Sequence, residues 1–98
     1  MADLRFAWDP RKAKENARKH GVEFEEAQTV FLDDRALLIG DPGHSEDEDR
    51  FVLLGMSSRL RILTVCHCYR EEDDVIRLIS ARKADRPERL EYERRVQR

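Results

Sequence analysis

The sequence predicts a single α+β domain, residues 1–98, in which two N-terminal helices precede an antiparallel β-meander of about four strands and a C-terminal helix follows it. Three observations support this fold class. Helix start and stop signals frame residues 10–20, strand-like segments follow one another between residues 36 and 83, and a second helix start stands at residues 85–88. The later strand-like segments are joined by short connections, whereas a parallel crossover would need a dozen or more residues. The strands are therefore expected to run antiparallel.

The first helix is framed by strong local signals. Asp9 is a favourable N-cap and Pro10 suits the first helical position, so the helix is expected to begin there. It should end at His20, because Gly21 can adopt the left-handed conformation that closes many helices. Few of its residues are apolar, so it should bury a narrow stripe and leave its basic side chains at the surface. The residues before it, 4–8, could form a short edge strand.

Two more helices are expected. After the first helix, four apolar residues recur at helical spacing: Phe24, Ala27, Val30 and Phe31. Their side chains should face the core rather than stack on bases. The last helix should begin at Pro87, with Glu88 favourably placed near the positive end of the helix dipole. It is almost wholly charged, so one side of it should face solvent or a partner.

Strand-like segments predict four strands, at residues 36–39, 50–56, 61–69 and 75–83. In the last one, β-branched residues and leucine lie between Arg77 and Arg82. Strict alternation places these two arginines on opposite faces of the sheet, so they would share a groove only if a bulge intervened. Arginine is rarely buried without a partner, so each should pair with a carboxylate or face an anion.

The composition predicts a folded domain with a heavily ionised surface, because charged residues make up 41% of the chain and apolar residues 40%. No signal-peptide pattern and no long apolar run is present, so we expect a cytoplasmic protein without a membrane segment. The net charge of −2 hides an uneven distribution, with basic residues in excess in 1–20 and 59–98 and acidic residues in excess in 21–58. If the fold brings the basic segments together, they would form a positive surface.

The two cysteines, Cys66 and Cys68, are expected to be free thiols. Two residues along a strand separate their Cα atoms by about 6.6 Å, with side-chain geometry that suits a disulfide poorly. A zinc site needs four converging ligands, whereas strand alternation sends His67 away from both cysteines. We therefore predict no metal site and no cofactor.

Basic side chains near the two ends of the chain are candidates for phosphate binding. They are Lys12, Lys19, His20, Arg50, Arg77, Arg82 and Lys83, with Trp8 and Tyr92 as possible stacking partners for bases. His20 or His67 could exchange protons near neutral pH, as attack by an RNA 2′-hydroxyl on its own phosphate requires. Both also have structural explanations. A histidine in an apolar strand is more often a core residue, and one at a helix C-terminus relieves the helix dipole.

The order of several residues resembles the BrnT toxin family. The N-terminal part of the resemblance consists of Trp8-Asp9-Pro10, Lys12, Asn16, Lys19-His20-Gly21-Val22, Phe24-Glu25 and Ala27. The remainder consists of Val30-Phe31, Asp33, Asp41, Glu48, Arg50, Gly55, Arg77, Ile79-Ser80-Ala81-Arg82, Glu88 and Tyr92. A helix that ends in Lys-His-Gly combined with a distant Ile-Ser-Ala-Arg strand is specific, whereas either piece alone would be weak.

The resemblance implies a small bacterial type II toxin, similar in fold to the RelE-like ribonucleases, that degrades RNA and arrests translation. It also implies a cognate antitoxin of the BrnA kind, which neutralises the toxin and carries a domain that binds operator DNA. The helices and strands predicted from the residues agree with that fold.

On this basis we expect metal-independent cleavage of RNA by attack of the 2′-hydroxyl. Arginines would neutralise the charge that develops on the phosphate, a histidine would exchange protons, and lysines would hold the backbone. The expected catalytic residues are His20, Arg50, His67, Arg77 and Arg82, and the expected RNA-binding residues are Trp8, Lys12, Lys19, Lys83 and Tyr92. The alternative is a non-catalytic protein-binding module that uses the last helix and the acidic segment 40–49, with its arginines merely ion-paired.

Overall fold

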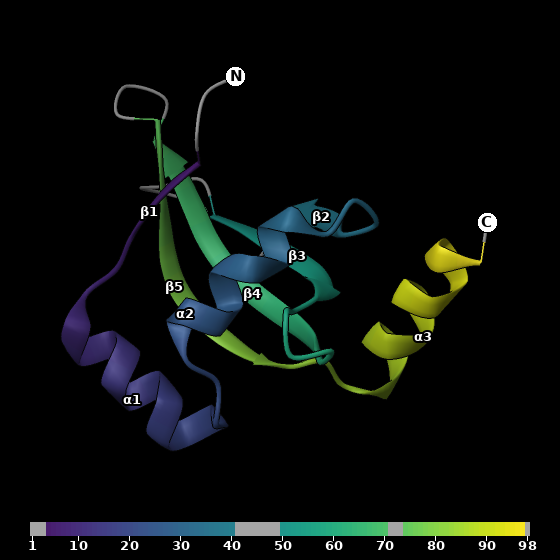
Figure 1. Cartoon of the computed structure of the whole chain (residues 1–98), viewed down its shortest axis with the longest axis horizontal. Helices are drawn as coiled ribbons and strands as arrows, with labels where there is room; N and C mark the ends of the chain where they lie inside the picture. Colours follow the sequence, from purple (N-terminus) through teal and green to yellow (C-terminus); the bar gives the residue numbers. More distant parts are fainter. Residues whose placement is uncertain (1–3, 41–49, 71–73, 98) are drawn as a thin grey trace.

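The computed structural model describes residues 4–40, 50–70 and 74–97, and its centre is a β-sheet (Figure 1). The elements are β1 Arg5–Ala7, α1 Pro10–His20, α2 Phe24–Ala27, the 3₁₀ helix η1 Gln28–Leu32, β2 Leu37–Gly40, β3 Arg50–Met56, β4 Ile62–Arg70, β5 Val75–Lys83 and α3 Arg86–Val96. Helices α1 and α2 lie against one face of the sheet. Helix α3 stands apart from them, beyond the end of β5 (Figure 1).

The sheet has five strands in the order β1-β5-β4-β3-β2. Strands β2 to β5 pair antiparallel in chain order, which confirms the predicted meander. The expected count of about four strands is corrected to five, because Arg5–Ala7 pair in parallel with Val75–Arg77 at the start of β5. The short edge strand expected within residues 4–8 is therefore part of the main sheet. Its partner lies seventy residues away along the chain, and no local sequence signal identifies such a partner.

Helix α1 has the predicted limits, and one polar residue fixes it to the sheet. The carboxylate of Asp9 accepts a hydrogen bond from the Arg11 amide at 2.8 Å, and Gly21 closes the helix with φ of 69°. The buried amide group of Asn16 donates to the carbonyl oxygen of Ala81 at 2.8 Å and accepts from its N–H at 3.0 Å. This paired hydrogen bond places α1 across the second half of β5.

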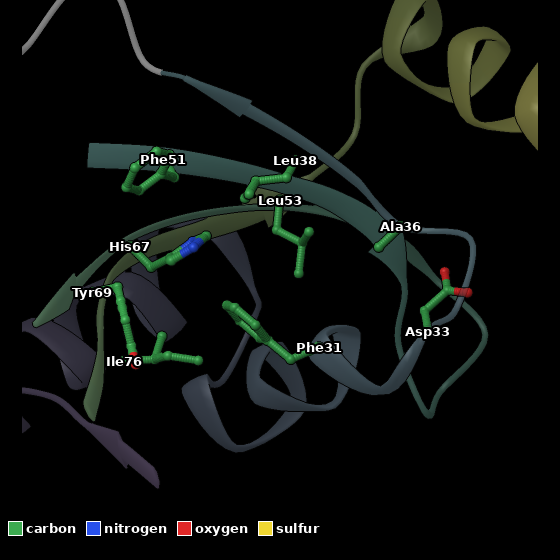
Figure 2. A pocket seen from close by; sticks show the side chains of 9 residues that line it. All are labelled: Phe31, Asp33, Ala36, Leu38, Phe51, Leu53, His67, Tyr69 and Ile76. Atoms are coloured by element: carbon green, nitrogen blue, oxygen red, sulfur yellow. The ribbon is translucent and has the colours of Figure 1, made fainter. Parts of the chain in front are cut away.

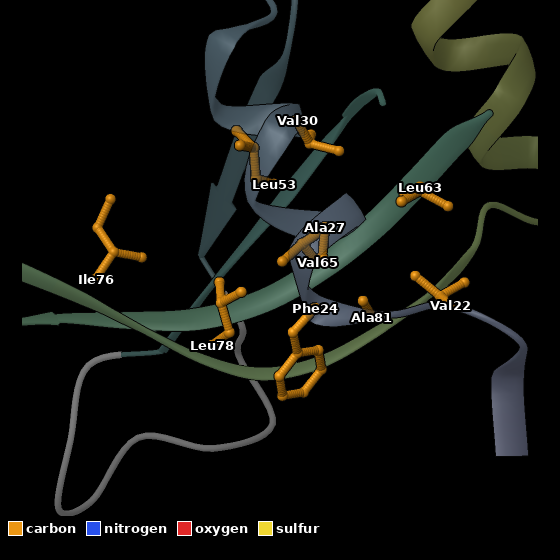
Figure 3. Close-up of a cluster of buried hydrophobic side chains, with 10 residues drawn as sticks. All are labelled: Val22, Phe24, Ala27, Val30, Leu53, Leu63, Val65, Ile76, Leu78 and Ala81. Carbon is orange, nitrogen blue, oxygen red and sulfur yellow. The ribbon is translucent and has the colours of Figure 1, made fainter. Parts of the chain in front are cut away.

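The predicted second helix begins as one α-helical turn, α2, and continues as the 3₁₀ helix η1. Its apolar residues pack on the sheet as predicted, with Phe24, Ala27 and Val30 fully buried and Phe31 partly buried at the margin. Figure 3 shows the resulting core cluster between α2, η1 and strands β3 to β5: Val22, Phe24, Ala27, Val30, Leu53, Leu63, Val65, Ile76, Leu78 and Ala81. The main core thus lies on the helix-covered face of the sheet.

Gly55 allows the chain after η1 to approach β3 closely. A Cβ atom at this position would lie 2.9 Å from both the Ala36 Cβ and the Val30 Cγ1. The close approach lets the Asp33 carboxylate, at the end of η1, accept a hydrogen bond from the Met56 N–H at 2.8 Å. This contact ties the helical layer to one end of the sheet.

Helix α3 covers part of the opposite face. Leu53 belongs to the main core, whereas its neighbour Leu54 packs with Ala84 and Tyr92 of the α3 region. Adjacent residues of a strand point to opposite faces, so α3 lies on the face away from α1 and α2. We call this face the outer face. A capping box between Asp85 and Glu88 begins the helix.

An irregularity in β5 changes which side chains reach the outer face. Cys66 pairs with Ser80, but the next residue of β4, His67, pairs with Leu78, so Ile79 is an extra residue in β5. Such a bulge reverses the alternation beyond it. The strict alternation expected for this strand is therefore wrong, and Arg77 and Arg82 lie on the same face.

Candidate functional site

Two arginines from different strands lie in line on the outer face. Arg50 of β3 pairs with Cys68 of β4, and Cys68 pairs with Arg77 of β5. Side chains of paired residues share a face, and strands lie about 4.8 Å apart, so the two arginines flank Cys68 at a backbone separation of roughly 10 Å. Arg77 is exposed and Arg50 is half-buried. Within the described part of the chain, Arg77 forms no ion pair.

Arg82 lies on the same face but already has an anionic partner. Its Nη1 and Nη2 donate to Glu88 Oε1 and Oε2 at 2.8 and 3.0 Å. The carboxylate also accepts hydrogen bonds from the Thr64 hydroxyl at 3.1 Å and the Asp85 N–H at 2.9 Å. Burial favours the neutral acid, but these hydrogen bonds outweigh it and lower the pKa of Glu88 to about 2. Arg82 therefore joins β4, β5 and α3 through a carboxylate that stays ionised.

His67 lies on the other face of the sheet, next to Cys68 in sequence but pointing towards the helical layer. Only 4% of its surface is exposed, and its Nδ1 lies 3.3 Å from the Val65 carbonyl oxygen. The Phe31 ring contacts it edge-on, with 4.8 Å between the ring centroids. Burial lowers the pKa of His67, because the charged imidazolium would lose its hydration. This histidine is neutral near pH 7.

The space beside His67 is a largely apolar cleft of about 420 Å³ (Figure 2). It is lined by Phe31, Asp33, Ala36, Leu38, Phe51, Leu53, His67, Tyr69 and Ile76. The Asp33 carboxylate at its edge is occupied, since it accepts hydrogen bonds from the Met56 N–H and from the Tyr92 hydroxyl at 2.6 Å. The cleft is therefore suited to an apolar or aromatic group, with the imidazole as its main polar feature.

The basic residues of α1 and the end of β5 lie apart from the outer-face arginines. Lys12 and Lys19 are exposed on α1, and His20 is half-buried at its last turn. The guanidinium of Arg61, just before β4, donates to the Gly21 carbonyl oxygen at 3.2 Å, so the end of α1 meets the β3–β4 connection. Lys83 at the end of β5 is exposed and pairs with Leu63, two residues after Arg61.

The two aromatic residues expected to stack on bases are packed against the protein. Trp8 meets Phe24 edge-on, with 5.8 Å between the ring centroids. Tyr92 has 5% of its surface exposed and donates its hydroxyl to Asp33. Burial together with the Asp33 carboxylate raises the pKa of Tyr92 to about 12. Tyr92 therefore offers no open ring face to a base, whereas Trp8 is only partly buried.

The predicted site residues thus form three groups. Arg50, Arg77 and Arg82 share the outer face, and His67 lies in the cleft on the opposite face. The basic residues of α1 belong to the helical layer, with Lys19 and His20 at the end that meets the β3–β4 connection near Lys83. Sequence reasoning missed the role of Glu88 as the partner of Arg82, although it placed Glu88 near the start of the last helix, where the structure has a capping box. It also missed the buried Glu26, which Arg61 pairs with across the fold.

Three further features concern metal ligands, thiols and membrane-spanning helices. No cluster of three or more histidine, cysteine or acidic residues suited to a metal ion occurs in residues 4–40, 50–70 and 74–97. Cys66 and Cys68 are thiols rather than members of a disulfide. Among the helices of the described ranges, none has the length and apolar character needed to cross a membrane.

Comparison with known proteins identifies the family. Residues 8–88 match the family model of BrnT, the ribonuclease toxin of a type II toxin-antitoxin system. Among solved structures, the chain is similar to the crystal structure of the Brucella abortus ribonuclease toxin BrnT, with 21% identity, a TM-score of 0.64, and coverage of 86% of this chain and 100% of that chain. No curated protein matches the chain. At this identity the structural similarity shows a shared fold, whereas the family model spans most of the sequence. The chain therefore belongs to the BrnT family of ribonuclease toxins of type II toxin-antitoxin systems.

Proposed function

We propose that this protein is an endoribonuclease that cleaves RNA by metal-independent attack of the 2′-hydroxyl and thereby inhibits translation in the cytoplasm. The match of residues 8–88 to the BrnT family model carries this proposal. As its counterpart we propose a BrnA-like antitoxin that binds the toxin and connects the pair to operator DNA. A fold relationship to the RelE-like ribonucleases belongs to the same proposal.

We assign the RNA phosphate to the outer face, beside Arg77. Its exposed guanidinium can approach a phosphodiester, and Arg50 lies on the same face on the far side of Cys68. Guanidinium groups suit this role because they remain charged and match phosphate oxygens with two donors at once. Arg82 adds positive charge at the α3 end of the same face, where Glu88 fixes its orientation.

In this proposal His20 or His67 exchanges protons with the RNA, but neither histidine lies on the outer face with Arg50, Arg77 and Arg82. A general base must come within about 2.6–3.2 Å of the proton that it takes, or act through one water. His67 is separated from Arg77 by the sheet itself, and its access is through the apolar cleft. The geometry therefore favours charge stabilisation by Arg77 as the principal contribution, with Lys12, Lys19, Lys83 and Trp8 supporting RNA binding, whereas the buried Tyr92 supports the fold.

Cleavage of a labelled single-stranded RNA by the purified protein in EDTA tests the proposal. We expect cleavage without added metal and a loss of about 100-fold in rate for Arg77→Ala, because a positioned charge stabiliser is typically worth that much. Arg94→Ala, at an exposed position of α3, serves as the matched control and should cleave normally. Circular dichroism should show that both variants are folded. Intact RNA in every reaction would instead support the binding-module alternative.

A further inference from the structure

The connection between β3 and β4 contains a strained leucine at its tip. The Ser57 N–H donates to the Arg61 carbonyl oxygen at 2.8 Å, and the Leu60 N–H donates to the Ser57 carbonyl oxygen at 2.9 Å, which closes a tight turn. Leu60 has φ of 62°, in the left-handed region. Its surface is 81% exposed.

Both properties of Leu60 are unfavourable for the isolated fold. A left-handed conformation costs a residue with a Cβ about 1–2 kcal/mol, and glycine or asparagine is usual at such turn positions. An exposed leucine buries too little surface to offset that cost. Non-glycine residues held in this region concentrate at functional sites. The turn therefore presents an apolar side chain that packing within the domain does not explain.

The surroundings of this turn are basic. The Arg61–Gly21 hydrogen bond brings the end of α1, with Lys19 and His20, to the turn. The end of β5 lies at the same end of the sheet (Figure 1), since the Ala84 N–H donates to the Ile62 carbonyl oxygen at 2.9 Å. We define the basic end as the residues Lys19, His20, Arg59, Leu60 and Lys83.

The carboxylates near these cations have other partners in ion pairs, although Glu26 also interacts electrostatically with Arg59 and Glu15 with Lys19. Glu26 already pairs with Arg61 and accepts a hydrogen bond from the Ser57 hydroxyl, and Glu88 pairs with Arg82. Within residues 4–40, 50–70 and 74–97, the side chains of Arg59, Lys19 and Lys83 form no ion pair. Three cations, one at the end of α1, one at the end of β5 and one in the turn itself, therefore lie at the end of the sheet that carries the exposed leucine.

We propose that the basic end is a second RNA-contacting surface, in which Arg59, Lys19 and Lys83 bind backbone phosphates and Leu60 packs against an unpaired base. This inference rests on the proposed ribonuclease function and extends its substrate beyond the nucleotides at Arg77. Lys83 lies six residues from Arg77, about 20 Å along a strand. The substrate is thus a single-stranded RNA long enough to reach both surfaces, because bases are open to side chains only where they are unpaired.

RNA accounts for these features better than a protein partner does. Repeated phosphates match several exposed cations on different elements, and apolar side chains are used elsewhere to pack against bases or separate them. A protein ligand would account for Leu60 but would have to supply a carboxylate for each cation. The experiment must therefore distinguish RNA binding at the basic end from binding of the antitoxin there.

Binding of the full-length protein to a fluorescent single-stranded 2′-O-methyl RNA tests the inference, because this probe lacks the attacking hydroxyl and stays intact. For the double variant R59A/K83A we expect at least tenfold weaker binding and a slope of log affinity against log salt that is smaller by about 1 per removed cation. Arg94→Ala is the matched control and should bind like the unaltered protein. Cleavage by R59A/K83A should show a raised KM.

The variant Leu60→Gly separates a role in recognition from a role in folding. It removes the strained Cβ, so the melting temperature should rise, while binding of the 2′-O-methyl RNA should weaken several-fold. A lowered melting temperature would overturn the inference by showing that Leu60 supports the fold. Unchanged RNA binding by both R59A/K83A and Leu60→Gly would overturn the inference as well. If these variants bound RNA normally and lost only antitoxin binding, the basic end would be an antitoxin surface and the inference would be wrong. If the unaltered protein cleaves no RNA, the proposed function fails, but the binding series still decides this inference.

Discussion

Arg82 and Glu88 face each other in a two-point ion pair at the junction of β5 and α3, with donor–acceptor distances of 2.8 and 3.0 Å. The same carboxylate holds Thr64 of β4 and caps α3 through the Asp85 N–H. One side chain therefore connects the sheet to the last helix, and this connection supports the positions of the arginines on the outer face.

Replacing Glu88 by glutamine should lower the free energy of unfolding by about 2 kcal/mol at pH 7, because the half-exposed guanidinium of Arg82 loses its charged partner and the Thr64 and Asp85 donors lose a charged acceptor. The pKa of Glu88 is about 2 in the folded protein against 4.5 ordinarily. Because the pKa of Glu88 is lowered on folding, its carboxylate stabilises the fold at pH values above the ordinary pKa of 4.5. This contribution is lost as the pH falls from there towards 2. Urea unfolding should thus show the difference between the two proteins shrinking between pH 5 and pH 3.

The control for this prediction is Glu91→Gln, which removes the exposed pair with Arg94 at 3.3 Å. It should change stability by less than about 1 kcal/mol, since exposed pairs contribute little. A difference between the unaltered protein and Glu88→Gln that stays constant down to pH 3 would show that the carboxylate charge does not stabilise the junction.

Asn16→Ala should destabilise the protein by about 2–3 kcal/mol. The substitution leaves the Ala81 N–H and two carbonyl oxygens without their buried side-chain partner. Chemical denaturation monitored by far-ultraviolet circular dichroism measures the loss. Lys14→Ala on the exposed side of α1 is the matched control and should be neutral within about 0.5 kcal/mol. Equal stabilities of the two variants would contradict the assigned role of the amide.

Gly55→Ala should lower the free energy of unfolding by about 1–3 kcal/mol, because the added methyl group would overlap Ala36 and Val30 at 2.9 Å. Thermal unfolding is the measurement. Gly21→Ala is the control for a steric effect, because no atom lies within 4 Å of a Cβ at that position. Only its left-handed φ of 69° makes alanine unfavourable there. In a protein that already carries Val30→Ala, which shortens the neighbouring side chain, Gly55→Ala should lower the free energy of unfolding by less. Simple additivity of the two changes would argue against a steric cause.

His67 should make the fold sensitive to mild acid. Burial lowers its pKa, so the unfolded chain binds the proton more readily and stability falls as pH drops below about 6.5. The slope approaches at most about 1.4 kcal/mol per pH unit for one proton. Unfolding of His67→Leu should show a weaker pH dependence between pH 7.5 and 5.5. An identical dependence in both proteins would assign the acid sensitivity to other groups.

Local signals predicted the helices and the meander well. Asp9, Pro10 and Gly21 set the limits of α1 through capping and backbone conformation, which depend on neighbours in sequence. The position of β1 beside β5 could not be predicted in this way, because that pairing depends on residues at opposite ends of the chain. The bulge at Ile79 also has no local marker, since no glycine stands there.

The candidate site was predictable in its residue types but not in its arrangement. The arginines were recognised as candidates for anion binding, yet their shared face results from the bulge in β5. His67 was expected to be either a core residue or a proton carrier, and only the register of β4 places it away from Arg77. Nothing in the sequence indicated that Leu60 is exposed or that its backbone is left-handed, because both properties arise from the folded turn.

The place of β5 in the sheet has a consequence for synthesis of the protein. β5 lies between β1 and β4, so the first strand to leave the ribosome has no neighbour until residues 75–77 have followed it. Arg50 likewise acquires its companion Arg77 only at that stage. A polypeptide that ends before β5 therefore lacks the partner of β1 and the second of the two arginines, so the arginine pair proposed to bind RNA forms only when translation is nearly complete.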